Sequence, residues 1–163
     1  MLSKNLFFAR FALIIFGIII APQAPLFASF PSGTKVLTPK GLIPIEDLML
    51  LSTPITSLDP ETGAIDSTKI SCIKLGFEFG LIEITTDKGT VTVGKKQRIY
   101  ERKRQGFIAA EHLRINDILV SIKYGHCVCL YTEEVGSYSN AYDLFLEKPL
   151  AYFLTELRLL GTK

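Results

Sequence analysis

The sequence predicts an all-β domain, a barrel or sandwich built from short strands and hairpins. Short apolar runs recur along the chain after residue 28, and clusters of turn-forming residues separate them at regular intervals. The composition, with 48% hydrophobic and 21% charged residues, excludes a disordered acidic or basic tail. A length of 163 residues indicates about one domain.

The expected strands lie between recognisable turns. Gly41 closes the first turn, because a tight turn often needs the positive φ that glycine adopts without strain. The segments 59–63 (DPETG) and 87–89 (DKG) are hairpin signals. Two further turns are expected at 102–105 and at Gly125. We therefore expect strands at 35–38, 56–58, 68–75, 81–86, 90–93, 98–101, 106–108, 118–122, 127–131, 142–146 and 152–154.

Apolar positions within this framework are expected to bury together. Residues 42–51 contribute to this set, although their spacing fits a helix and a strand equally well, so their state stays open. The charge run at 101–104 is expected to be a solvated hairpin tip, and no internal repeat is visible. The expected core consists of Val36, Leu37, Ile45, Leu48, Leu58, Ile70, Ile82, Ile84, Val91, Val93, Ile99, Ile108, Leu113, Ile118, Val120, Leu144, Phe153 and Leu157.

The first 28 residues have the pattern of a secretory signal peptide. Lys4 and Arg10 form a basic start, an apolar run follows at 11–21, and small or turn-forming residues lead to Ala28. The apolar run is shorter than the roughly 20 residues that a membrane-spanning helix needs. We expect cleavage after Ala28, an exported domain at 29–163, and a periplasmic or extracellular location. An uncleaved membrane anchor is the alternative.

Charge argues against nucleic acid as a partner. The net charge of +2 comes from the two basic residues of the leader, and the remaining chain has 16 basic and 16 acidic residues. A chain without a basic excess lacks the electrostatic footprint of nucleic-acid binding. We expect contact with a membrane only transiently, through the leader.

Soft metal ligands are few. His126, Cys127 and Cys129 form the one cluster, and only one residue separates the two cysteines, whereas paired zinc ligands usually have two to four between them. We expect ordinary buried or half-buried cysteines here, with a metal site as the weaker alternative. His112 is expected in a surface turn, and no cofactor is expected. Pairing of Cys72 with either of the other cysteines is left to geometry.

Four stretches together resemble the Hint family, which comprises inteins, hedgehog autoprocessing domains and bacterial pre-toxin domains. In each, the order and spacing of the residues match the family pattern. They are 29–48 (SFPSGTKVLTPKGLIPIEDL), 58–63 (LDPETG), 90–120 with GFIAAEHL and NDIL, and 141–157 with AYDL and YFLTEL. The resemblance implies the pseudo-symmetric β fold of that family.

The resemblance also implies a chemistry, a self-directed acyl shift. An N-terminal Cys or Ser attacks the preceding carbonyl carbon, a histidine protonates the departing amine, and a Thr orients the bond. A weak nucleophile needs such a positioned acid or base, because an amine is a poor leaving group. Inteins also cyclise a terminal Asn to cut the second junction.

At most of the positions that carry these roles in the family, this sequence has a different type of residue. Ser29 stands at the nucleophile position and Gln97 at the histidine position, where a glutamine cannot deliver a proton near neutral pH. Gly94 occupies the place of the orienting Thr, although Thr92 is only two residues earlier. Leu150 stands at a late histidine, and Thr162 and Lys163 stand at the terminal His-Asn. The resemblance therefore implies a kept fold with lost splicing machinery.

We expect an exported stand-alone Hint-like domain without splicing or autocleavage. It would be a binding or structural module for an unidentified protein partner, or a remnant of a toxin system, and we expect a monomer. One alternative is an active domain that cuts Ala28–Ser29 through Ser29, with Gln97 or Lys96 in place of the histidine. The other is a membrane-anchored periplasmic protein with an uncleaved leader.

Overall fold

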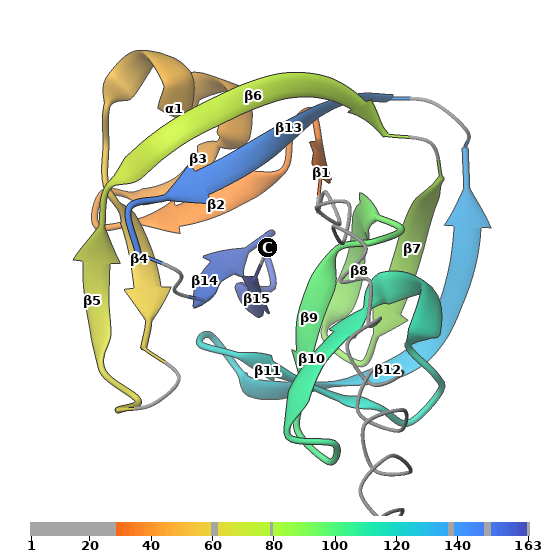
Figure 1. Cartoon of the computed structure of the whole chain (residues 1–163). Coiled ribbons are helices and arrows are strands. Elements are labelled where there is room, and N and C mark those ends of the chain that lie inside the picture. The colour runs from red at the N-terminus through yellow and green to blue at the C-terminus, as the bar shows by residue number, and fades with distance from the viewer. Residues whose placement is uncertain (1–28, 60–61, 79, 137–138, 149–150, 163) are drawn as a thin grey trace, which may run out of the picture.

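The computed structural model describes residues 29–59, 62–78, 80–136, 139–148 and 151–162 (Figure 1). The expected signal peptide at 1–28, Leu150 and Lys163 lie outside the described residues. Within these ranges almost every element is a strand. The elements are β1 (Ser29–Pro31), β2 (Lys35–Thr38), β3 (Gly41–Pro44), α1 (Ile45–Leu51), β4 (Ile55–Leu58), β5 (Ile65–Thr68), β6 (Ile70–Glu78), β7 (Leu81–Thr86), β8 (Gly89–Gly94), β9 (Arg98–Glu101), β10 (Gly106–Ala109), the 3₁₀ helix η1 (Ala110–His112), β11 (Ile118–Ser121), β12 (Gly125–Val135), β13 (Ser139–Leu146), β14 (Ala151–Leu154) and β15 (Leu159–Thr162).

Two sheets organise the described chain. One has the order β1-β13-β6, and the other runs β3-β2-β14-β15-β9-β11-β12-β7-β8, with β10 on β9 and β4 on β14 and β5. All of these pairings are antiparallel. The short β14–β15 hairpin lies between the two halves of the molecule (Figure 1). The all-β prediction is confirmed.

The two halves repeat one plan around this hairpin. In the first half β2 pairs with β3 and β14, and in the second half β9 pairs with β10 and β15. The segments 41–48 (GLIPIEDL) and 106–113 (GFIAAEHL) share the pattern G-x-I-x-x-E-x-L, and each starts as a strand that turns into a helix. The expectation of no internal repeat is therefore wrong. The repeat is hard to see in the sequence because the turn before the shared pattern is two residues longer in the second half.

The same backbone hydrogen bonds recur in both halves. Thr34 N–H donates to the Pro31 carbonyl oxygen at 3.1 Å, and Gln97 N–H donates to that of Gly94 at 2.9 Å. The Thr34 carbonyl then accepts from Ile45 N–H at 2.9 Å, as that of Gln97 accepts from Ala110 N–H at 2.8 Å. Position 34 in the first half thus corresponds to position 97 in the second. By the same count, Ser29 corresponds to Thr92.

Each half has its own apolar core. The first collects side chains from β1, β2, α1, β4, β13 and β14, and the second collects side chains from β7 to β9, η1, β11, β12 and β15. Thirteen of the eighteen expected core residues are buried. The exceptions are half-buried: Leu58, Ile70, Ile108, Ile118 and Val120.

The core residues expected in β11, Ile118 and Val120, lie on the face of the strand that is only half-buried. Leu119 and Ser121 are its buried residues, because the face that carries them meets the second core and the turn before β15. The prediction also missed β1, β5 and β15, and with β1 it missed the buried Phe30. The ten residues at 42–51 divide into the end of β3 and the helix α1, which resolves the ambiguity of their spacing.

The charged turn at 101–104 corrects a second expectation. Arg102, Lys103 and Arg104 are exposed, but the side chain of Glu101 is completely buried. Its carboxylate accepts backbone N–H groups of Lys103 at 3.1 Å, Arg104 at 2.7 Å and Ile118 at 3.0 Å. The isolated charge pattern could not show this, because Ile118 is brought in by the tertiary fold.

Candidate functional site

Ser29 begins β1 beside a carboxylate. The strand pairs with β13 so that Ser29 stands opposite Asp143, and the Ser29 Oγ–H donates to Asp143 Oδ1 at 2.9 Å. Ser29 is only 7% exposed. The next residue, Phe30, is fully buried and packs edge-to-face on Tyr152, with ring centroids 5.9 Å apart. This anchor fixes the serine hydroxyl against a group that can accept its proton.

Asp143 lies in the middle of a polar row across the three-stranded sheet. On its other side the register places Lys74 of β6 directly opposite, so Ser29, Asp143 and Lys74 share one face. The Lys74 ammonium lies 5.1 Å from the centroid of the Phe145 ring. Burial, together with the negative charge of Asp143, holds the pKa of Tyr152 far above its ordinary value. The Tyr152 hydroxyl is therefore neutral and unsuited to act as a base.

Thr92 of β8 and the connection between β1 and β2 lie on opposite sides of a cleft. β8 runs beside β1, and a cleft of about 400 Å³ lies between the β1–β2 connection, strands β7 and β8, and the turn at 155–156. Thr92 and Pro31 both line it. The register pairs Thr92 with Glu83, which also lines the cleft. Thr92 is thus near the strand that carries Ser29, on the half of the molecule opposite to it.

Gln97 is buried and its side chain is hydrogen-bonded to β15, the last strand; we call this contact the Gln97–Thr162 clamp. Its side chain is completely buried, and its Nε2 donates to the carbonyl oxygens of Arg98 at 2.9 Å and Thr162 at 3.0 Å. Its Oε1 has no hydrogen-bond partner within the described residues. Gly161 fits beside it, since a Cβ there would lie 3.1 Å from Gln97 Nε2 and 2.7 Å from Leu154 Cδ1. The fold thus brings the Gln97 and Thr162 positions together.

Lys96, the other candidate for the histidine's role, is already paired. Its ammonium donates to Glu111 Oε1, and this contact, ahead of the opposing effect of burial, lowers the pKa of Glu111. Lys96 is exposed, whereas Glu111 is half-buried. Lys96 is the structural counterpart of Gly33 in the first half, which donates its backbone N–H to Glu46 instead.

The side chains of His126, Cys127 and Cys129 do not gather around one point. His126 is exposed, whereas Cys127 and Cys129 are completely buried in the second core. Burial raises the pKa of both thiols, which keeps them protonated. No group of three potential metal ligands lies together within the described ranges.

Cys72 is exposed on β6, and all three cysteines are unbridged. His112 lies exposed in η1, as expected for a surface turn.

Asp143 is the residue that sequence reasoning missed. It belongs to the AYDL stretch of the resemblance, but no role was assigned to it. It lies 114 residues from Ser29 along the chain, so only the β1–β13 pairing brings the two together. The signal available in the sequence is an acidic residue between the apolar residues of 141–146, since Asp is mostly exposed in folded proteins.

Known structures share the fold of this chain. An intein-like domain from Clostridium thermocellum superposes with a TM-score of 0.74 at 18% identity, covering 83% of this chain and 99% of that chain. A DnaB intein from Synechocystis gives a TM-score of 0.70 at 14% identity, with coverage of 83% and 99%. A DnaX mini intein from Spirulina platensis gives 0.68 at 16%, again covering 83% and 99%. Neither a protein-family model nor a curated protein matches the sequence.

The chain therefore has the Hint fold, the fold of inteins and intein-like domains. This confirms the resemblance at the level of the fold, including the two related halves. At these identities the likeness establishes no activity. Among the described residues, no helix has both the length and the apolar character needed to cross a membrane.

Proposed function

We propose that this chain is an exported Hint-fold domain that neither splices nor cuts itself, and that serves as a binding or structural module. The observation that carries the proposal is the state of Gln97. It occupies the histidine position of the resemblance, it is completely buried, and its only donor group is engaged by two backbone carbonyls. An amide side chain has no proton to give near neutral pH, so the departing amine has no acid at this position.

The residue type that inteins use to cut the second junction is also replaced. Cyclisation requires the side-chain amide of an Asn, and the chain has Thr162 and Lys163 there. The carbonyl of Thr162 instead accepts a hydrogen bond from Gln97, which ties the end of β15 into the sheet. The hydrogen bond between Gln97 and Thr162 holds β15 in place, a role that suits a stable module.

One observation favours a second candidate function, cleavage at Ala28–Ser29 alone. The Ser29 hydroxyl donates to Asp143, which can accept its proton. In such a reaction Ser29 Oγ attacks the Ala28 carbonyl carbon and gives its proton to Asp143. The C–N bond then breaks, and Asp143 returns the proton to the Ser29 amine. Water hydrolyses the resulting ester, leaving a carboxylic acid on Ala28 and the hydroxyl on Ser29.

The test compares the wild-type chain with Ser29→Ala and Asp143→Asn in export-competent cells, by intact mass. The proposal predicts the same N-terminus in all three proteins, because signal peptidase makes the cut. If the wild type is processed and both variants keep the leader, the second candidate is correct. A wild-type chain with its leader that stays intact after purification and incubation with hydroxylamine, which cleaves esters, further supports the absence of an acyl shift.

The histidine position offers a complementary test. General acid catalysis typically contributes about 10²- to 10⁴-fold in rate. Gln97→His is therefore expected to make ester formation at Ser29 detectable, if the rest of the site is still competent. Cleavage in Gln97→His that disappears in the double variant with Ser29→Ala would identify Gln97 as the residue that silences the site.

A further inference from the structure

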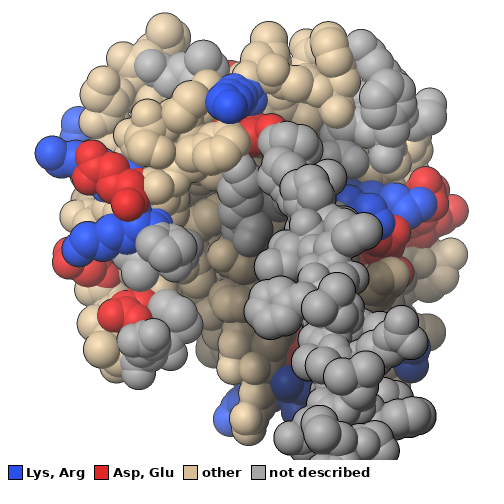
Figure 2. Space-filling model, viewed as in Figure 1, with Lys and Arg blue, Asp and Glu red and all other residues tan. Residues whose placement is uncertain are grey.

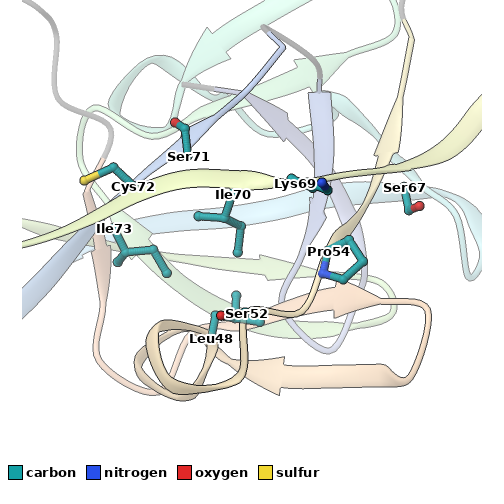
Figure 3. Close-up of a pocket in the computed structure, with 9 residues that line it drawn as sticks. All are labelled: Leu48, Ser52, Pro54, Ser67, Lys69, Ile70, Ser71, Cys72 and Ile73. Carbon is teal, nitrogen blue, oxygen red and sulfur yellow. The ribbon is translucent and has the colours of Figure 1, made fainter.

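A cavity of about 730 Å³ opens between α1 and the β5–β6 connection. Figure 3 shows Ile70 and Ile73 of β6 pointing toward Leu48, in the middle of the helix, and Ser52, just after its end. Ser67, Lys69 and Cys72 complete its rim. This cavity is on the side of the first half away from the cleft near Thr92, and the chemistry discussed above uses none of its residues.

The helix and the strand that wall this cavity also carry large apolar side chains that face solvent. Leu50 is 84% exposed and Leu51 is 55% exposed, both at the end of the helix that forms one wall. On the strands, Leu75 and Phe77 of β6 are 61% and 56% exposed. We call this region the α1–β6 surface. Large exposed apolar patches on a soluble protein usually mark an interaction site, which makes this surface the candidate for one.

The edge of β6 is open. Within the described residues β6 pairs only with β13, so the backbone groups of its other edge have no strand partner. β6 is nine residues long and contains no proline. A long exposed edge of this type is a template for strand addition. It crosses the top of the molecule in Figure 1 and ends near β7.

Several features favour a second copy of this chain as the occupant. Antiparallel pairing of one edge with itself is two-fold symmetric, and the same surface carries both a cavity and a protruding leucine, Leu50. Its charges are also mixed. Lys69 at the rim and Asp47 on α1 are exposed, and neither has an ion-pair partner in the described part of the chain. On the neighbouring side of the molecule, where β4 and β5 lie, Figure 2 shows acidic and basic side chains interleaved. Two copies can therefore match opposite charges, which an all-basic or all-acidic surface could not do.

We propose that two copies of this chain associate through the α1–β6 surface, with their β6 edges antiparallel and Cys72 of one copy facing Cys72 of the other. In this register Lys74 faces Ile70 of the second copy, so the two lysines of β6 do not oppose each other. The odd exposed cysteine fits the arrangement, since an unpaired cysteine in an exported protein points to intermolecular pairing. The proposal deepens the binding role above and replaces the expectation of a monomer.

Sedimentation velocity of the purified chain measures the association directly. We expect a dimer that dissociates on dilution, and a weakening of at least tenfold in Leu50→Asp, whose side chain is too exposed to be needed for folding. The matched control is Leu130→Asp, a leucine of β12 in the second half that is 48% exposed, which should leave the dimer unchanged. A monomer at every concentration up to about 100 µM would overturn the proposal, because a specific interface of standard size binds more tightly than that.

Oxidised glutathione tests the register. The Cys72 thiolate attacks the glutathione disulfide and releases one glutathione thiol. Cys72 of the second copy then attacks the mixed disulfide and releases the other, so two protein thiols are oxidised and one disulfide is reduced to two thiols. We expect a covalent dimer that Cys72→Ser abolishes while the non-covalent dimer remains. Only glutathionylated monomer from a dimeric wild type would contradict the Cys72 register. Because self-association is measured on purified protein and processing by mass, this inference and the proposed function can fail separately.

Discussion

In the first half of the molecule the hairpin after β2 is held by Thr38, and in the second half the equivalent hairpin after β9 is held by Glu101. Thr38 Oγ accepts the N–H of Lys40 at 3.1 Å and donates to the Gly41 carbonyl at 2.8 Å. Glu101 accepts three N–H groups, one of them from β11. A neutral hydroxyl thus closes one turn locally, whereas a buried carboxylate ties the other turn to a distant strand. The same scaffold accepts both solutions.

The two halves differ in the same way at their candidate site residues. Ser29 and Thr92 occupy equivalent places, as do Thr34 and Gln97. Ser29 stands opposite Asp143 and Thr92 stands opposite Glu83, and the Ser29 hydroxyl donates a hydrogen bond to its carboxylate. In the resemblance, the nucleophile comes from one half and the acid from the other. Here the first half holds the Ser29 hydroxyl next to the Asp143 carboxylate. In the second half Gln97, at the histidine position of the resemblance, is buried and hydrogen-bonded to two backbone carbonyls.

The largest expected difference between the halves is between Glu101→Ala and Thr38→Ala. Removing the buried carboxylate leaves three backbone donors without their partner, so we expect a loss of about 3 kcal/mol in the free energy of unfolding. Thr38→Ala removes one hydroxyl and should cost about 1 kcal/mol. Urea denaturation measures both. Equal losses would mean that the two turns are held with the same strength.

Glu101 also predicts a pH dependence. Burial acts to raise its pKa, but the N–H groups of Ile118, Arg104 and Lys103 outweigh burial and hold the pKa below the ordinary value of 4.5. The stabilisation is therefore complete above pH 4.5 and is lost as the pH falls through the lower pKa of the folded state. Acid titration of the wild type against Glu101→Gln should show this loss only in the wild type.

Gly161 of β15 tests how tightly the chain packs around Gln97, where the two halves meet. An added Cβ would lie 2.7 Å from Leu154 Cδ1 and 3.2 Å from the Arg98 carbonyl oxygen, which belongs to the backbone and cannot move aside. We expect Gly161→Ala to cost about 2 kcal/mol in the free energy of unfolding through overpacking. Gly76→Ala, with nothing within 4 Å of the added Cβ, is the control. A similar cost at both glycines would show that the clamp around Gln97 can relax.

A smaller effect is expected where the halves use the same turn. The β2–β3 turn (TPKG) and the β7–β8 turn (TDKG) each end in a glycine with positive φ, 110° at Gly41 and 137° at Gly89. Alanine at either place meets strain of about 1–2 kcal/mol. Gly89→Ala should cost slightly more, since its Cβ would lie 3.4 Å from Leu157 Cδ2. Thermal unfolding of both variants measures the difference, and a larger loss at Gly41 would contradict the ranking.

The smallest expected effect separates Glu46 from its counterpart Glu111. For Glu46, burial acts to raise the pKa, but its own N–H, that of Gly33 and the Ser32 hydroxyl outweigh it. For Glu111 the main cause of the lowered pKa is the Lys96 ammonium. Added salt screens an exposed ion pair more than it weakens backbone hydrogen bonds. Carboxyl titration by NMR should therefore show the pKa of Glu111 rising with salt more than that of Glu46.

The sequence by itself determined most of the local structure. The strands at 35–38, 81–86 and 98–101 are found with the expected bounds, because hairpin signals and apolar alternation act between near neighbours. The order of the four Hint-like stretches likewise indicated the fold. Thirteen core residues followed from the same local patterns, since a strand flanked by turns leaves few ways to bury its apolar face.

Tertiary structure alone decided the polar interior and the surfaces. The Ser29–Asp143 pair, the Gln97–Thr162 clamp and the burial of Glu101 each join residues far apart along the chain. Local spacing carries no information about such pairs, because the energy of a buried polar group depends on the partner that the whole fold supplies. The open edge of β6 has the same origin, since a strand becomes an edge only through the order of strands in its sheet.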